Sequence, residues 1–313
     1  MPEEKKYLYG PVPSRRLGRS LGVDIVPFKL CSLDCVYCQL GKTTEKNLER
    51  SDFIPVEAVL AELKEKLVAG LQADFLTIGG SGEPTLHSRL GALIDGIKKL
   101  TAIPVAILTN GTMLYKPDVR ADCAKADVVL PSLDAGDEQT YQRINRPHTG
   151  LTIEKLVSGL CAFRDEFSGQ IWLEVFLIDG FNTDNHQIAK IKEAIDRIRP
   201  DKVQLNTAVR PTTEPGIKAL DPERLRAIAQ QLGENCELIA DFSSARQGGN
   251  FQARAEDVLS MLKRRPCSLS DISAALSITP NEALKYITLL QQQGAIDSQN
   301  KDGVIFFSKQ IAD

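Results

Sequence analysis

Short apolar runs alternate with amphipathic stretches between residues 21 and 206, and this alternation limits the possible folds more than any other property of the chain. Apolar runs bounded by turn residues predict buried strands, and apolar residues three or four apart predict helices. The sequence therefore predicts strand–helix units around a parallel sheet. The expected strands are 21–26, 75–78, 105–109, 128–131, 171–177 and 202–206.

These units are too few for a closed barrel, which has eight parallel strands. We therefore expect an α/β fold, an open (βα)6 partial TIM barrel, with helices over 56–67, 90–100 and 188–198. In such folds ligands bind beyond the carboxyl ends of the strands. Motifs that directly follow a strand are therefore the candidates for a functional site.

The chain changes character after the sixth strand. A Pro-rich loop at 210–215, a helix near 221–232 and a weak strand near 237–240 complete the barrel domain, which we assign to 1–242. Residues 243–254 contain Gly248 and Gly249 and predict a linker. Residues 255–313 form a second, small domain.

The small domain has the pattern of a winged helix-turn-helix. A first helix contains Val258, a second begins near Ser268 and ends near Leu276, and a hairpin follows with strands at 295–298 and 304–307. Thr279, Pro280 and Glu282 predict the start of a third helix, which Gly294 ends. The domain carries six Lys and Arg against seven Asp and Glu. This balance favours docking of a protein or peptide, or structural support, over strong DNA binding.

Composition and charge indicate the cellular compartment of the chain and the classes of partner that it lacks. The net charge of −3 gives no support for nucleic-acid binding by the whole chain. Seven cysteines, three of them clustered, fit a reducing cytoplasm better than a disulfide framework. No apolar run approaches the length of a membrane span, and the start of the chain has no signal-like apolar segment. We expect a cytoplasmic protein without a membrane partner.

Three closely spaced cysteines follow the first predicted strand, as Cys31-x3-Cys35-x2-Cys38. A [4Fe–4S] cluster normally takes four thiolates. The next cysteine is Cys123, so this run would leave one iron open for chemistry. The alternative is a structural zinc site, but zinc would require a fourth Cys or His close by, and the nearest histidine is His87. The other cysteines are scattered, so one cluster is expected.

A glycine-rich segment follows the second strand, with Gly80, Ser81, Gly82 and Glu83. Glycines let the backbone approach a ligand closely, and the carboxylate of Glu83 would complement an ammonium group. The alternative is a tight turn whose acidic residue is favoured by the dipole of the following helix.

Polar residues also follow the later strands, where they would face a bound cofactor. The candidates are Thr109 and Asn110 after the third strand, Ser132 and Asp134 after the fourth, Glu174 on the fifth and Asn206 on the sixth. Thr109 and Asn110 could equally form a turn. A buried carboxylate at Glu174 needs a partner, either a cofactor hydroxyl or a lysine.

Two basic segments are candidates for contacts with an anionic substrate or cofactor. Arg15, Arg16 and Arg19 precede the first strand without an intervening acidic residue, and Arg146 and His148 follow the fourth βα unit. Either segment could instead be a solvated loop.

The cysteine motif, with the aromatic Tyr37 before its last cysteine, resembles the signature of the radical S-adenosylmethionine (radical SAM) superfamily. Residues 10–18 together with Gly82-Glu83-Pro84-Thr85-Leu86-His87 resemble a branch of Fe–S oxidoreductases distantly similar to the radical enzymes of wybutosine synthesis. The resemblance implies that Cys31, Cys35 and Cys38 hold a [4Fe–4S] cluster whose open iron binds S-adenosylmethionine. It places Tyr37 beside adenine and Ser81–Glu83, where the family pattern is usually Gly-Gly-Glu, beside the methionine amine.

The activity implied by the resemblance is reductive cleavage of S-adenosylmethionine to a 5′-deoxyadenosyl radical, which abstracts hydrogen from a substrate. The implied partner is a one-electron donor such as flavodoxin or ferredoxin. The charge of the chain favours a protein, peptide or metabolite substrate over nucleic acid. Two alternatives remain open: a redox-sensing regulator acting through the tail, and a partner-binding protein with a structural cluster.

Overall fold

The computed structural model describes residues 7–214, 216–239, 255–276, 278 and 280–310. The predicted linker at 243–254 and the predicted capping residue Thr279 lie outside the described residues, as does the side chain of Glu282. The boundary between the two predicted domains therefore stays a prediction.

One eight-stranded sheet forms the larger part of the molecule, with its strands in chain order from β1 to β8. Strands β2 to β8 run parallel to their neighbours, and β1 is antiparallel to β2 at the edge. The strands are β1 (Leu8–Ser14), β2 (Gly18–Val23), β3 (Phe75–Ile78), β4 (Val105–Thr109), β5 (Val128–Pro131), β6 (Gln170–Leu177), β7 (Lys202–Thr207) and β8 (Cys236–Leu238). The predicted α/β class and mostly parallel sheet are confirmed, and the sheet is consistent with a partial barrel.

The six predicted strands are present as β2 to β7, and the sheet has two more strands, β1 and β8, at its two ends. Strand β1 contains Gly10, Pro11 and Pro13, residues that argue against a strand interior but are tolerated at a sheet edge. Strand β8 has three residues, and the weak strand expected near 237–240 corresponds to it.

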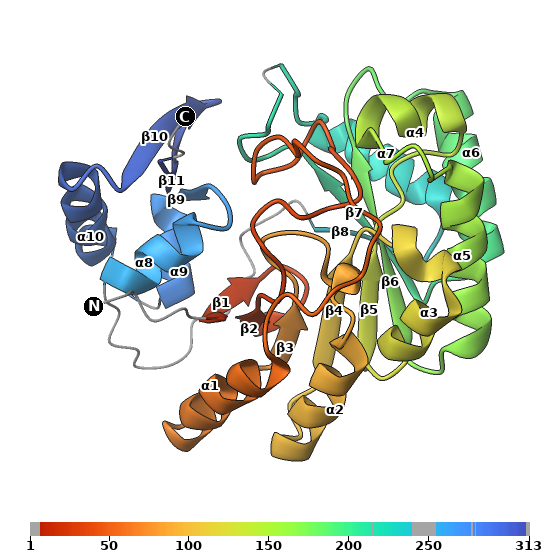
Figure 1. The fold of residues 1–313 in the computed structure, drawn as a ribbon. Coiled ribbons are helices and arrows are strands. Elements are labelled where there is room, and N and C mark those ends of the chain that lie inside the picture. The colour runs from red at the N-terminus through yellow and green to blue at the C-terminus, as the bar shows by residue number, and fades with distance from the viewer. Residues whose placement is uncertain (1–6, 215, 240–254, 277, 279, 311–313) are drawn as a thin grey trace.

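Helices connect the parallel strands and cover the sheet (Figure 1). Their apolar faces are buried; on α2, for example, Leu90, Leu93, Ile94 and Ile97 are fully buried. The helices are α1 (Val56–Val68), α2 (Leu90–Leu100), α3 (Pro117–Cys123), α4 (Glu138–Asn145), α5 (Ile153–Glu166), α6 (Asn185–Ile198) and α7 (Pro222–Leu232), with short 3-10 turns η1 (Pro84–Leu86) and η2 (Thr112–Tyr115).

The C-terminal part forms a small unit with its own apolar core, which includes Val258, Ile272, Ile287 and Phe307. Its sheet is antiparallel with strand order β10–β11–β9, and its helices α8 and α9 lie beside β1 (Figure 1). The elements are α8 (Ala255–Leu262), β9 (Cys267–Ser268), α9 (Leu269–Leu276), α10 (Pro280–Gln292), β10 (Ile296–Lys301) and β11 (Val304–Lys309). Every predicted helix and hairpin strand of this part is present, and β9 is additional.

Among the described residues, no helix combines the length and apolar character needed to cross a lipid bilayer.

Candidate functional site

The three cysteines Cys31, Cys35 and Cys38, here called the cysteine triad, lie in the loop that follows β2. All three are partly buried. Each sulfur accepts one N–H hydrogen bond from another residue: Asn110 Nδ2 lies 3.5 Å from Cys31 Sγ, Asn145 Nδ2 lies 3.4 Å from Cys35 Sγ and Lys29 Nζ lies 3.2 Å from Cys38 Sγ. Such donors stabilise sulfur in its thiolate form and tune the metal that it binds.

Two members of the triad, Cys31 and Cys35, favour the protonated thiol when no cation is bound. Burial raises the pKa of Cys31 to about 12, and the nearby Glu83 adds to this effect. Burial also raises the pKa of Cys35 well above its ordinary value, with a contribution from Asp134. A bound metal reverses this preference, because it stabilises the negative sulfur directly.

The triad does not have the geometry of a single-ion site. Within the described residues, no three or more His, Cys, Asp and Glu side chains are grouped so that they could hold one metal ion. Structural zinc requires four such ligands around one point. In a cluster each thiolate binds a different iron atom, and three free thiols in one loop supply the donor chemistry that such a group takes.

Glu83 connects the glycine-rich segment to the loop after β4. Its Oε1 accepts hydrogen bonds from Thr85 N at 3.0 Å, Thr85 Oγ1 at 2.5 Å and Thr109 Oγ1 at 2.6 Å, and its Oε2 accepts one from Asn110 N at 2.7 Å. Burial raises the pKa of Glu83, although these hydrogen bonds lower it. The carboxylate predicted to complement an ammonium group is thus already bonded by donors of this chain.

Tyr37 and Asp134, which the sequence placed on separate segments, are in contact. Asp134 Oδ2 accepts hydrogen bonds from Tyr37 OH at 2.5 Å and from Asn145 Nδ2 at 2.7 Å. The Tyr37 ring stacks on Phe176 with the ring centroids 3.9 Å apart. Burial raises the pKa of Asp134 to about 6. Asn145 therefore bridges Asp134 and the sulfur of Cys35.

Glu174 has an arginine and an amide as partners. Arg16 Nη1 lies 2.7 Å from Glu174 Oε2, and Asn206 Nδ2 donates to Glu174 Oε1 at 2.8 Å. Burial opposes ionisation of Glu174, but Arg16 and Asn206 outweigh it and hold its pKa below the ordinary value. Arg15 continues the network, with Nη1 3.4 Å from Asn206 Oδ1. Ser132 joins it through a backbone bridge to Glu174. The lysine considered from the sequence is thus replaced by Arg16, and a contact of Glu174 with a cofactor hydroxyl stays a prediction.

The remaining basic candidates separate into two places. Arg146 Nη1 lies 2.6 Å from Glu214 Oε1 and 3.7 Å from Asp34 Oδ2, and the backbone N–H of His148 donates to Ser32 O at 2.9 Å, so both adjoin the cysteine loop. Arg19 lies at the start of β2, at the opposite end of that strand from the cysteines, where it pairs with Asp74 at 3.2 Å. The structure does not bring Arg19 to the site.

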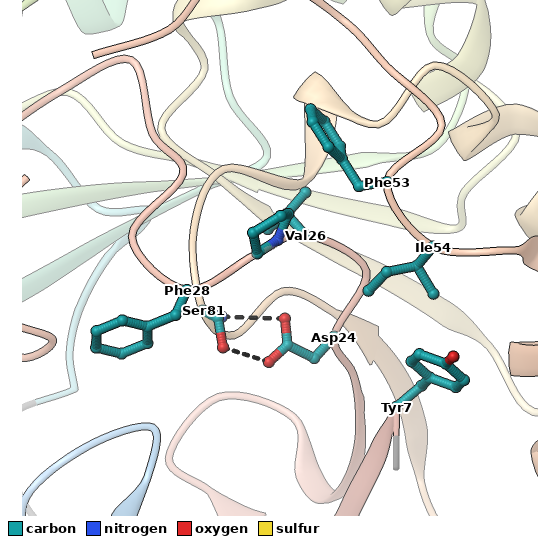
Figure 2. Close-up of a pocket in the computed structure, with 8 residues that line it drawn as sticks. Tyr7, Asp24, Val26, Phe28, Phe53, Ile54 and Ser81 are labelled. Carbon is teal, nitrogen blue, oxygen red and sulfur yellow. Dashed lines mark hydrogen bonds between the residues drawn. The ribbon is translucent and has the colours of Figure 1, made fainter. Parts of the chain in front are cut away.

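Sequence reasoning missed Asp24, which directly follows β2. Its carboxylate accepts hydrogen bonds from Ser81 N at 3.2 Å and Ser81 Oγ at 2.5 Å, as Figure 2 shows. A pocket of about 330 Å³ opens beside this contact and is lined by Tyr7, Asp24, Val26, Pro27, Phe28, Phe53, Ile54 and Ser81. One charged residue inside the apolar run 21–26 is the signal that could have identified Asp24.

Comparison with protein families identifies this arrangement. The profile of the Radical SAM superfamily matches residues 25–191, which include the cysteine triad and strands β3 to β6. The chain belongs to the radical SAM superfamily. Membership supports S-adenosylmethionine and an iron–sulfur cluster as cofactors in general terms. The predicted link to wybutosine synthesis stays a prediction.

Two curated relatives cover nearly the whole chain. A UPF0026 protein of Methanocaldococcus jannaschii is 33% identical over 313 residues, which are 97% of this chain and 96% of that protein. The chain therefore also belongs to the UPF0026 family. A protein of Brachyspira hyodysenteriae named GTPase Obg is 37% identical over 98% of this chain. The chain spans only 45% of that longer relative.

Solved structures show the same fold at low sequence identity. SuiB of Streptococcus suis has a TM-score of 0.53 and 18% identity, and the alignment covers 72% of this chain and 50% of SuiB. This likeness supports the fold of the radical SAM part alone.

Proposed function

We propose that the protein is a radical SAM enzyme in which the cysteine triad binds three irons of a [4Fe–4S] cluster and S-adenosylmethionine binds the fourth. When bound, these cofactors supply a 5′-deoxyadenosyl radical for hydrogen abstraction, after one-electron reduction by a donor such as flavodoxin or ferredoxin. The observation that carries the proposal is that each of the three sulfurs accepts a hydrogen bond from its own N–H donor: Lys29 of the same loop, Asn110 after β4 and Asn145 at the end of α4.

Residues of the chain have distinct tasks in this proposal. Lys29, Asn110 and Asn145 orient the sulfurs, and Lys29 also places a positive charge beside Cys38. The backbone of Ser81–Glu83 faces the methionine amine, and Thr109 and Asn110 face the aminocarboxylate. Tyr37 lies beside adenine, and the remaining polar side chains contact the ribose or adenine; these are Ser132, Asp134, Glu174 and Asn206.

The order of elements in the C-terminal unit is α8, β9, α9, α10, β10 and β11, with β10 and β11 as a hairpin. We assign this order to a winged helix-turn-helix domain. Its acidic balance favours docking of a protein or peptide substrate, or a structural role beside a metabolite-binding barrel, over nucleic acid. With its reduced cysteines, the enzyme belongs in the cytoplasm.

Substitution Cys35→Ala tests the proposed function. Anaerobically reconstituted wild-type protein should show the brown [4Fe–4S] absorbance and release 5′-deoxyadenosine and methionine under strong reductant. C35A should lose both the absorbance and the release, because a cluster held by two thiolates is unstable. The matched control is C161A, which removes a half-buried cysteine on α5. Cleavage at the wild-type rate in C35A, or zinc in place of iron in the wild type, would refute the proposal.

A further inference from the structure

Two side chains, Tyr9 on β1 and Asp24 directly after β2, hold the glycine-rich segment in place. Tyr9 on β1 donates its hydroxyl hydrogen to Gly79 O at 3.1 Å. Asp24 binds both the backbone N–H and the hydroxyl of Ser81 (Figure 2). The backbone of this segment is unusual, since Gly79 and Gly80 have φ values of 154° and 156°, which glycine adopts more readily than other residues.

Tyr9 and Asp24 both contact one residue of the C-terminal unit, Arg264. Its guanidinium carbon lies 3.8 Å from the centroid of the Tyr9 ring, and its Nε lies 3.4 Å from Asp24 Oδ2. Arg264 is itself fixed, because its Nη1 donates to Ser260 O at 2.8 Å and to Ser260 Oγ at 3.0 Å. The side chains of Arg264 and Asp24 are only 13% and 10% exposed, so their attraction is less screened than that of a surface pair.

Glycines make this contact possible. A Cβ on Gly22 would lie 2.0 Å from the Tyr9 ring, so only glycine at this position lets the ring lie across β2. A Cβ on Gly80 would lie 2.9 Å from the carboxylate carbon of Asp24. The close packing leaves Tyr9 and Asp24 little freedom, so a change at Arg264 is transmitted to the segment that they support.

We propose that Arg264 is a positioning residue for the glycine-rich segment, so that the C-terminal unit forms part of the S-adenosylmethionine site rather than an independent appendage. The inference rests on the proposed function in one respect, the assignment of Ser81–Glu83 to the methionine amine. The physical step is local: Arg264 fixes Tyr9 and Asp24, and these fix the carbonyl of Gly79 and the amide of Ser81.

The competing explanation is that Arg264 only attaches the C-terminal unit to the larger sheet. Other contacts between the two units allow this role to be tested separately from positioning of the glycine-rich segment. Asp271 of the C-terminal unit pairs with Arg210 at 3.3 Å, and Lys301 Nζ donates to Ala208 O at 2.6 Å. Val12 on β1 packs against the apolar core of the unit. These contacts keep the unit docked when Arg264 is replaced.

The test compares R264M and R264K with the control K263M, which removes an exposed cation from the neighbouring position. Amide hydrogen exchange of residues 79–83 is measured in cofactor-free protein, and S-adenosylmethionine affinity is measured by equilibrium dialysis with reconstituted protein. For R264M we expect faster exchange at 79–83 with unchanged exchange in α9 and α10, and a Kd raised roughly three- to thirtyfold. R264K should restore part of both effects, and K263M should match the wild type.

Two results would overturn the inference: wild-type exchange at 79–83 in R264M, or exchange that rises equally throughout α9 and α10, which would reduce Arg264 to a docking residue. If the wild-type protein binds no S-adenosylmethionine, the proposed function fails, while the exchange data still decide whether Arg264 positions the segment.

Discussion

Glu83 joins two loops through a single carboxylate, which ties the segment after β3 to the segment after β4. Its four donors come from Thr85, Thr109 and Asn110, and Asn110 in turn reaches the sulfur of Cys31. At the residue scale, Glu83 therefore sets the relative position of the glycine-rich segment and one sulfur donor.

Substitution E83Q should lower the free energy of unfolding by about 1–3 kcal/mol. The new amide N–H₂ group is a donor, and it would face N–H or O–H groups that are also donors, so at least one hydrogen bond is lost. Urea denaturation of the cofactor-free protein measures this loss. The control E45Q, at an exposed glutamate, should change the value by less than about 0.5 kcal/mol. Equal stability of E83Q and E45Q would show that the hydrogen bonds to Glu83 contribute nothing.

Motif residues were predictable one by one, whereas their partners were not. The cysteine triad and Glu83 stand out because their spacing and position after a strand carry the signal. The pairing of Arg16 with Glu174 joins residues 158 positions apart, and no local pattern specifies such a contact. The same holds for Arg264 and Asp24, which only the folded chain brings together.

At the scale of elements, strands β3, β4 and β5 have the bounds expected from the sequence. They are buried apolar runs that end at glycine, asparagine or serine, and such boundaries are sharp. Strand β1 was missed because its prolines contradict a strand, and β9 because two residues carry no periodicity. The inner strands of the sheet can therefore be predicted from the sequence, whereas the formation of edge strands depends on how they pack in the folded chain.

His87, at the end of η1, makes the stability of the fold depend on pH. Its Nε2 donates to Ile54 O at 3.0 Å, and its Nδ1 accepts from Arg89 N at 3.1 Å, so the buried ring is neutral. Burial lowers the pKa of His87 below its ordinary value of 6.5, although Ile54 O and Asp52 oppose this. Because the folded pKa is the lower one, the stability due to neutral His87 is complete above the unfolded pKa and declines as the pH falls below it.

We expect wild-type protein to lose more unfolding free energy than H87Q between about pH 7.5 and about pH 5.5. At the higher pH, H87Q should itself be less stable by about 1–3 kcal/mol, since a buried hydrogen bond is lost. Urea denaturation at both pH values checks both statements, with H186Q, at an exposed histidine of α6, as the control. If the unfolding free energies of the wild type and H87Q changed equally between the two pH values, His87 would not be the source of the pH dependence.

At the scale of the molecule, the two units are joined by charge as well as by apolar packing. The Arg210–Asp271 pair is almost fully buried, with side-chain exposures of 2% and 6%. Lys301 on β10 donates to the carbonyls of Ala208 and Arg210, which lie in the loop after β7. The Pro-rich loop at 210–215 was visible in the sequence as a break after the last long strand, but its use as a docking surface depends on two long-range contacts of Arg210, with Asp271 and with Lys301.

Substitution D271N should uncouple the two units. Asparagine keeps an oxygen that can accept from Ser268 N, as Asp271 does at 2.9 Å, but it removes the negative charge that Asp271 places beside the buried Arg210. Removing one partner of a buried pair costs about 3–5 kcal/mol, so we expect a cooperative thermal transition to divide into two, with the C-terminal unit unfolding first. Calorimetry measures the transitions, and hydrogen exchange in α9 and α10 assigns the earlier one.

The control D297N, at an exposed position of the hairpin, should melt like the wild type. The double variant R210M/D271N should recover part of the loss, because it no longer buries a cation without its carboxylate. A single unshifted transition in D271N would mean that the other contacts, those of Lys301, Val12 and Arg264, are enough to hold the units together. In that case the buried ion pair fixes the orientation of the C-terminal unit without adding to its attachment, and the two roles of the interface are carried by different residues.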